Sequence, residues 1–155
     1  MTTKPVAASK VVMTQLVMPG DTNSLGSVFG GTVMSWIDIC AAIAAQRHSN
    51  SEVVTASLDQ MSFVAPVYKG WVVNLKASVN FVAKTSMEVG VRVDAENPKT
   101  GETFHTASAY LTFVAIGSDG KPIPVPQLSL ESDEDRRRFA AGRTRRELRL
   151  AHRSR

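Results

Sequence analysis

The sequence of 155 residues has a single cysteine, few aromatic residues and no long apolar run. One cysteine excludes a disulfide within the chain and fits a reducing compartment, so we expect a cytoplasmic protein. No run reaches the roughly 18 apolar residues that a transmembrane helix needs. The first ten residues also lack the apolar centre of a secretory signal peptide.

Several signatures of enzyme chemistry are missing as well. The three histidines are scattered at positions 48, 105 and 152, and no His/Cys cluster has the spacing of a metal site. No Gly-x-Ser-x-Gly motif is present, which argues against the Ser-His-Asp chemistry of α/β-hydrolases. The lone Cys40 has no cationic neighbour in its apolar segment, so we interpret it as a small core residue rather than a nucleophile.

Positive charge is scarce outside the C-terminal end. Residues 1–130 carry nine basic and nine acidic residues, whereas residues 131–155 carry nine arginines and five acids, which gives the whole net charge of +4. The basic character of the whole chain therefore says little about the partners of its neutral part. The basic end could contact nucleic acid, but its acids are interleaved and Phe139 is its only aromatic residue, so we expect no such binding.

The stretch from Asn23 to Ala45 is the centre of the chain. It begins with small polar residues and glycines and continues as an apolar segment without proline or glycine, Thr32 to Gln46, which predicts a buried helix. Asp38 is the only charge between Asp21 and Arg47, and burying a carboxylate is costly unless it is paired. Gly30 and Gly31 stand where the helix begins, where free N–H groups favour negative charge. A carboxylate near such an anion site is a catalytic arrangement, although a lone aspartate can also be structural.

The rest of the chain alternates in the manner of strands. We expect a loose arm over residues 1–10, a strand over Val11 to Val17 and then the helix, with His48 at its end as an exposed or dipole-stabilising residue. Further strands are predicted from residues 53, 73, 87 and 103, joined by turns, which makes an antiparallel sheet of the α+β class. Residues 131–155 favour a helix with acids first and arginines later, and Gly142 is a candidate break in it.

One longer pattern resembles a known family. Met18-Pro-Gly-Asp-Thr-Asn23-x-x-Gly26-x-x-Phe29-Gly-Gly31-x-x-Met34-x-x-x-Asp38 is similar to the acyl-CoA thioesterases of the hotdog fold, in particular the small bacterial single-domain group. The resemblance implies one long buried helix wrapped by a curved antiparallel sheet over residues 11–126. It leaves residues 127–155 outside as a charged, arginine-rich extension.

The resemblance also assigns roles to residues. It implies that Asp38 acts as general base or nucleophile, that Asn23 helps orient the water or the carbonyl, and that backbone N–H groups at Gly31 and Gly30 form the oxyanion site. The segment Phe81-Val-Ala-Lys84-Thr-Ser-Met87 is similar to the coenzyme A contact of the family, which points to Lys84, Thr85, Ser86 and Met87. On this basis coenzyme A is part of the substrate, and no separate cofactor or metal is expected.

The same resemblance implies partners and leaves alternatives. Hotdog sites form between two protomers, so a homodimer is the expected minimum and a hexamer built as a trimer of dimers is the expected assembly. A dehydratase of the same fold is one alternative, but such enzymes usually place a histidine beside the acid, and residues 23–45 contain none. A non-catalytic acyl-CoA-binding module is the other, and it gives no reason for the carboxylate of Asp38.

Overall fold

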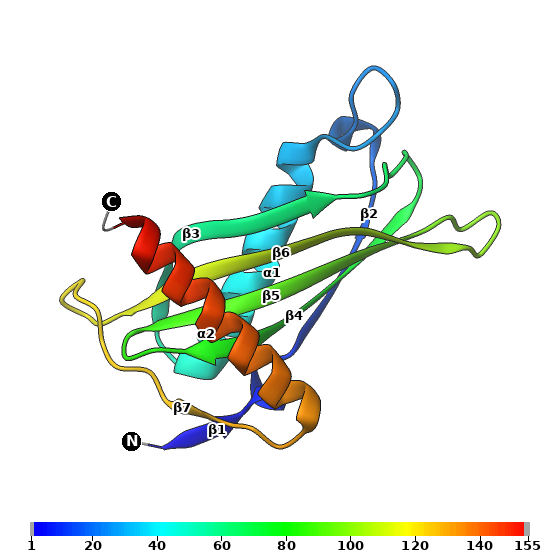
Figure 1. Ribbon diagram of the computed structural model, residues 1–155. Coiled ribbons are helices and arrows are strands. Elements are labelled where there is room, and N and C mark those ends of the chain that lie inside the picture. Colours follow the sequence, from blue (N-terminus) through cyan, green and yellow to red (C-terminus); the bar gives the residue numbers. More distant parts are fainter. Residues whose placement is uncertain (1, 154–155) are drawn as a thin grey trace.

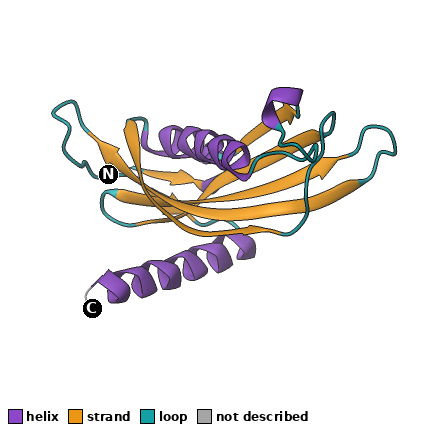
Figure 2. Ribbon diagram, turned by 90° about the horizontal axis from the view of Figure 1, so that it is seen from above, coloured by secondary structure: helices purple, strands orange, loops and turns teal. Residues whose placement is uncertain are grey.

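The computed structural model describes residues 2–153, which form a curved sheet with one helix on each face (Figures 1 and 2). The elements in chain order are β1 (Thr3–Pro5), η1 (Val6–Ser9), β2 (Val11–Leu16), η2 (Pro19–Asp21), α1 (Gly30–Ser49), β3 (Glu52–Phe63), β4 (Val72–Val82), β5 (Ser86–Glu96), β6 (Thr103–Ile116), β7 (Gln127–Ser129) and α2 (Asp133–Arg153). None of the helices in this part of the chain is long and apolar enough to cross a membrane.

The main sheet has the strand order β2-β4-β5-β6-β3, and every neighbouring pair in it is antiparallel. Its strands follow the alternation seen in the sequence, because successive side chains point to opposite faces. In β5, for example, Val89, Val91 and Val93 are buried beneath α1, whereas Arg92 between them is exposed on the other face. One long helix held by a curved antiparallel sheet confirms the predicted hotdog fold.

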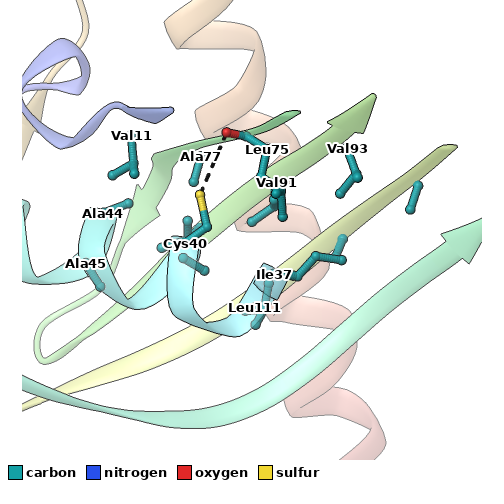
Figure 3. Close-up of a cluster of buried hydrophobic side chains, with 14 of the residues drawn as sticks. Val11, Ile37, Cys40, Ala44, Ala45, Leu75, Ala77, Val91, Val93 and Leu111 are labelled. Carbon is teal, nitrogen blue, oxygen red and sulfur yellow. Dashed lines mark hydrogen bonds between the residues drawn. The ribbon is translucent and has the colours of Figure 1, made fainter. Parts of the chain in front are cut away.

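Small side chains allow α1 to lie close to the inner face of the sheet (Figure 3). Val33, Ile37, Ala41 and Ala44 are almost fully buried against the strands. Cys40 lies in the same face, with its thiol 3.9 Å from the carbonyl oxygen of Leu75. Burial raises the pKa of the Cys40 thiol to about 11, so it is an unreactive core residue, as the sequence predicts.

The opposite side of α1 is not buried in the single chain, which corrects the expectation of a helix buried all round. Met34 is 43% exposed and Ile39 is 50% exposed, and Asp38 on the same side is partly exposed. The sheet covers one face of the helix only, since residues 2–153 place no further layer over α1 (Figure 2).

The N-terminal residues are packed, whereas the sequence predicted a loose arm over residues 1–10. Strand β1 pairs in parallel with β7, so the N-terminal strand lies beside the segment that leads into α2 (Figure 1). The Lys4 ammonium group donates to the Arg47 carbonyl and to Asn50, where it satisfies acceptors at the C-terminal end of α1. The buried Ser9 hydroxyl accepts a hydrogen bond from the Val79 N–H at 2.9 Å.

The arginine-rich extension forms α2, which crosses the outer face of the sheet (Figures 1 and 2). Two of its side chains form ion pairs with strand carboxylates: Arg145 donates twice to Glu88 at 2.7 and 2.8 Å, and Arg149 donates to Asp59 at 2.9 Å. The Phe139 ring also contacts the Phe81 ring, with centroids 4.9 Å apart. Residues 154–155 of the predicted extension lie outside the described residues.

Gly142 does not break α2, contrary to the sequence-based expectation. It is buried in the middle of the helix, at the point where the helix comes closest to the sheet. A Cβ atom at this position would lie 2.8 Å from Cβ of Phe81 and 3.1 Å from a carboxylate oxygen of Glu88. Glycine is therefore required by the close approach of two elements rather than by a turn.

His48 is also placed differently from the prediction of an exposed residue. Its side chain is fully buried at the end of α1, and Nε2 lies 2.7 Å from the carbonyl oxygen of Pro126. Burial lowers the pKa of His48 below its ordinary value, with the hydrogen bond to Pro126 opposing this shift and Lys4 adding to it. The extended segment before β7, which contains Pro126, packs over His48. The residues around His48 in the sequence give no sign of this contact.

We predict that Gly142→Ala destabilises the protein. Alanine normally improves a helix interior by about 1 kcal/mol, but here the added methyl group meets Phe81 and Glu88, and overpacking typically costs about 1–3 kcal/mol. Urea unfolding measures the difference in the free energy of unfolding. Ala141→Gly on the exposed side of α2 is the control, with a loss of only about 1 kcal/mol from helix propensity. A more stable Gly142→Ala protein would contradict the close packing of α2.

We predict that His48 makes the protein less stable in acid. Because the folded pKa is below the unfolded value of about 6.5, the unfolded chain binds the proton first as the pH falls. The stabilisation is complete above about pH 6.5 and decreases below it, by at most about 1.4 kcal/mol per pH unit. Urea unfolding at pH 7.5 and pH 5.0 should show a smaller pH effect in His48→Gln than in the wild type. His152→Gln, at an exposed histidine of α2, should keep the wild-type pH dependence.

Candidate active site

Asp38 lies on the side of α1 that faces β3, two turns inside the helix. Its carboxylate accepts a hydrogen bond of 2.8 Å from the Thr55 hydroxyl on β3. The side chain is only partly buried in the single chain, so the carboxylate is oriented by Thr55 while a second oxygen stays accessible. An oriented and accessible carboxylate can take a proton from a water molecule or attack a carbonyl carbon.

Asn23 organises the loop that leads into α1. Its side-chain oxygen accepts hydrogen bonds from the N–H groups of Leu25 and Ser27, at 2.9 and 3.3 Å, and its amide group contacts the Ser27 hydroxyl. These bonds make an Asx turn, the ordinary structural role of asparagine. Among the residues that the structure describes, no hydrogen bond joins Asn23 to Asp38.

Gly30 and Gly31 form the first residues of α1, and no side chain caps this end. The first helical N–H groups have no acceptor inside a helix, and the structure gives the N–H groups of Gly30 and Gly31 none within residues 2–153. A Cβ atom added at Gly31 would meet nothing within 4 Å. The start of α1 thus offers open, unpaired donors to a negatively charged oxygen.

Within one chain these donors and Asp38 are too far apart to act on one carbonyl group. Asp38 lies about 12 Å along the helix axis from Gly30, at 1.5 Å per residue. Oxyanion donors must lie about 3 Å from the reacting oxygen, and the attacking group must be equally close to the carbon. The structure therefore does not bring the predicted site residues together within a single chain.

The segment predicted to contact coenzyme A lies at the turn between β4 and β5. Lys84 is exposed and Thr85 and Ser86 are partly exposed, and their side chains make no hydrogen bond with the described part of the chain. Their backbone carbonyls hold the turn, because Lys84 accepts from Val125 and Thr85 accepts from Ala115. Met87 does not belong with them: its side chain is 1% exposed and lies in the hydrophobic core, because it is the first inward-facing residue of β5.

Thr55 is the residue at this site that the sequence analysis did not select. It belongs to the segment Glu52–Phe63, which reads as an ordinary strand rich in β-branched residues. The available signal was that a hydroxyl-bearing residue lies on a strand expected to pair beside the helix that carries Asp38. That signal does not say which strand residue faces the helix, because the alternation of β3 is interrupted.

Histidine and metal chemistry find no support at this site. Within residues 2–153 no histidine contacts Asp38, since His48 is buried at the helix end and His105 lies on β6 near Asp94, 3.5 Å away. No group of three or more His, Cys, Asp or Glu residues in that range could hold a metal ion.

A hollow of about 610 Å³ lies on the opposite face of the sheet, between α2 and the outer strand surface. Basic side chains line it, including Lys76, Arg92 and Arg138. Neither Asp38 nor Asn23 borders this hollow. The size of this hollow therefore does not by itself identify it as the reaction site, and the candidate residues Asp38 and Asn23 lie elsewhere.

Comparisons with known proteins identify the family of the chain. Residues 25–102 match the thioesterase superfamily. An uncharacterized acyl-CoA thioester hydrolase of Bacillus subtilis is 46% identical over 82% of this chain and 74% of its own length. The cytosolic acyl coenzyme A thioester hydrolase of Rattus norvegicus is 37% identical over 90% of this chain, which spans 37% of that longer protein.

Solved structures are similar over nearly the whole chain. An apo-hexameric acyl-CoA thioesterase has a TM-score of 0.94 and 41% identity, with 98% of this chain and 97% of that chain covered. The acyl-CoA hydrolase of Staphylococcus aureus, in complex with butyryl coenzyme A, coenzyme A and coenzyme A disulfide, has a TM-score of 0.90 and 36% identity, with 97% and 92% covered. Variants of that enzyme replace one aspartate, one asparagine or one threonine with alanine.

The fold, the aspartate on the central helix and the extent of these similarities lead to one conclusion. The chain belongs to the hotdog-fold acyl-CoA thioesterases of the thioesterase superfamily.

Proposed function

We propose that Asp38 performs the hydrolysis of acyl-CoA, as general base toward water or by direct attack on the thioester. The observation that carries this proposal is the single carboxylate on an apolar helix, oriented by the Thr55 hydroxyl and left accessible on its other side. As general base, Asp38 takes a proton from water, whose oxygen attacks the carbonyl carbon. Collapse of the tetrahedral intermediate then breaks the C–S bond, and the proton taken up by Asp38 passes to the leaving sulfur, so that coenzyme A leaves as the thiol and the free acid remains.

The Staphylococcus aureus variants support this choice of residues. The asparagine, aspartate and threonine replaced in them are separated by the same intervals as Asn23, Asp38 and Thr55 in this chain. Two of these residues were predicted from the sequence, and the third is the one that the structure connects to Asp38. The match in spacing favours a common site built from all three.

We further propose that each site is shared by two copies of the chain. Gly30 and Gly31 of one copy supply the oxyanion donors for Asp38 of the other, since one chain keeps them about 12 Å apart. Exposed apolar side chains on α1 and β3 favour such an interface: Met34, Ile39, Val54 and Phe63 are each more than 40% exposed. Strand β3 also has one unpaired edge, which a second copy can cover.

A larger assembly and the coenzyme contacts extend this proposal. The hexameric thioesterase similar to this chain favours a trimer of such dimers. Lys84 serves as a point charge for a phosphate of coenzyme A, and the free hydroxyls of Thr85 and Ser86 add donors. No resident cofactor or metal takes part, and the protein works in the cytoplasm. Release of free thiol from acyl-CoA substrates of increasing chain length tests the activity directly.

Nucleic acid is not a partner in this proposal. Four arginines of α2 bind acids of the same chain: Arg145 and Arg149 bind the sheet, and Arg136 and Arg138 bind Asp133 and Glu134 within the helix. The charge of these four arginines is compensated, which weakens the electrostatic attraction on which binding to a phosphate backbone depends.

We predict that Asp38→Asn removes most of the turnover while the fold is kept. The amide has the same shape but cannot accept the proton, and loss of a general base costs about 10²- to 10⁴-fold in kcat. Steady-state thiol release measures kcat, and circular dichroism checks the fold. Asp119→Asn, in the turn after β6, is the control and should retain wild-type turnover. A folded Asp38→Asn protein with wild-type kcat would show that another group performs the reaction.

We predict that two inactive variants restore activity when they are mixed. Asn23→Ala and Asp38→Asn should each be poorly active alone. If each site takes Asn23 from one copy and Asp38 from the other, a mixed dimer has one intact site and one site that lacks both residues. Random co-refolding gives half mixed dimers, so roughly a quarter of the wild-type activity should return.

Native mass spectrometry provides the control for this mixing experiment, because it shows whether mixed dimers have formed. Absence of recovery in a sample that contains them would contradict a site shared between two copies. Recovery without mixed dimers would point to reactivation of one variant by refolding alone.

A further inference from the structure

Strand β3 reverses its alternation directly after the residue that holds Asp38. Thr55 lies opposite Phe113 on β6, and Ser57 lies opposite Thr112, so Ala56 is an extra residue in this pair of strands. Residues two apart normally face the same side of a sheet. Here Thr55 faces α1, where it donates to Asp38, whereas Ser57 donates to Asp59 on the outer face. The bulge therefore decides which side chain reaches Asp38.

Asp59 holds this bulged segment from the outer face. It lies at a second register shift, between Leu58 and Gln60. Its carboxylate accepts three hydrogen bonds, from the Ser57 hydroxyl at 2.9 Å, the Thr112 hydroxyl at 3.0 Å and the Arg149 guanidinium at 2.9 Å. One carboxylate thus connects the bulge, the neighbouring strand β6 and the helix α2.

Within residues 2–153, Arg149 is the basic residue that forms an ion pair with Asp59, while Arg145 interacts with the same carboxylate electrostatically without a hydrogen bond. The side chain of Asp59 is 14% exposed and that of Arg149 is 19% exposed, so the pair is largely buried. Removing the partner of a carboxylate in such surroundings leaves an unpaired buried charge, which destabilises the folded protein. We expect the carboxylate then to move toward solvent. Within residues 2–153, β3 pairs on one side only, with β6, so the bulged segment depends on the bonds that Asp59 makes to Ser57, Thr112 and Arg149.

The ion pair between Arg145 and Glu88 connects α2 to a different strand, β5. Arg145 binds Glu88, which lies on β5 in the middle of the sheet and is 4% exposed. Arg145 also stacks over the Tyr110 ring, with 3.7 Å between the guanidinium carbon and the ring centroid. The direct ion pair of Arg145 thus attaches α2 to an interior strand, whereas among the ion pairs of residues 2–153 that of Arg149 with Asp59 attaches α2 to β3, the strand that carries Thr55.

We propose that Arg149 and Asp59 are positioning residues for the thioesterase site on the far side of the sheet. Through Asp59, α2 keeps β3 in the bulged register that aims the Thr55 hydroxyl at Asp38. The proposal rests on the role of Asp38 given above. It assigns the C-terminal helix a part in turnover that its distance from α1 does not suggest.

The expected effect is a loss of turnover with little change in substrate affinity. Arg149→Gln and Asp59→Asn should each lower kcat by about 2- to 30-fold, the range found for residues that act on a site through others. KM should change less, because neither residue lies at the turn proposed to bind coenzyme A. Arg149→Lys keeps a positive charge at the same place and should recover part of kcat.

Two arginines of α2 provide matched controls. The side chain of Arg146 makes no hydrogen bond or ion pair with residues 2–153. Arg146→Gln therefore removes the same charge without affecting a contact to β3. Arg145→Gln removes the stronger attachment of α2 and should lower the melting temperature at least as much as Arg149→Gln. If stability alone governed kcat, Arg145→Gln would be the less active variant; the proposal requires the opposite order.

A double-mutant cycle separates positioning from general destabilisation. Thr55→Val removes the hydrogen bond to Asp38, so adding Asp59→Asn to it should cost little further kcat. Losses that multiply fully in the double variant would overturn the proposal, because Asp59 would then act independently of Thr55. Near-complete loss of additivity supports it.

Amide hydrogen exchange tests the structural step without reference to catalysis. Arg149→Gln should accelerate exchange in residues 53–60, and Arg146→Gln should leave it unchanged. Unchanged exchange in Arg149→Gln would overturn the proposal, as would faster exchange with wild-type kcat. If exchange in Arg149→Gln rises while Asp38→Asn proves fully active, the assignment of Asp38 fails and the link between α2 and β3 stands.

Discussion

The close contact between α1 and the inner face of the sheet is the constraint on which the rest of the structure depends. Alanines at positions 41, 44 and 45 allow the helix backbone to approach the strands, and they are completely buried. With that face fixed, the opposite face is fixed too, because helical residues three and four apart share a side. Asp38 is thereby directed toward β3 and away from the core, where Thr55 can reach it. The orientation of the proposed catalytic carboxylate therefore follows from the packing of alanines on the other side of the helix.

The two faces of the sheet are covered by different physical means. Helix α1 is held by the burial of apolar side chains, which has no directional requirement. Helix α2 is held by two directional ion pairs and one ring contact, and a glycine permits its close approach to the sheet. Directed bonds can specify register in a way that apolar contact cannot, because they fail when a strand shifts by one residue. Strand β3 needs such specification, because it lies at an edge of the sheet and contains two register shifts. This division explains why the polar helix, and not the apolar one, is attached at Asp59.

The sequence allowed the fold and Asp38 to be predicted because both depend on short-range patterns. Alternation over residues 72–116 gave the central strands, and a charge inside an apolar helix drew attention to Asp38. Other features arise from partners far away in sequence, which no local pattern encodes. His48 is buried by Pro126, Gly142 is required by Phe81 and Glu88, and Asp59 is bound by Arg149 from the other end of the chain. The assignment of Met87 to the coenzyme site was wrong for a related reason, since a motif gives a position but not the face of the strand.

The sparse apolar contact beneath α2 has a thermodynamic consequence. Heat capacity and denaturant sensitivity both scale with the surface exposed on opening, and apolar surface dominates the heat capacity. Phe139 is the main apolar side chain between α2 and the sheet, while Leu148 points outward at 66% exposure. Detachment of α2 would therefore change heat capacity and m-value little, although it releases the carboxylates of the outer face. Calorimetry would record such a partly opened protein as almost native, and spectroscopic probes placed on α2 itself would be needed to distinguish the two states.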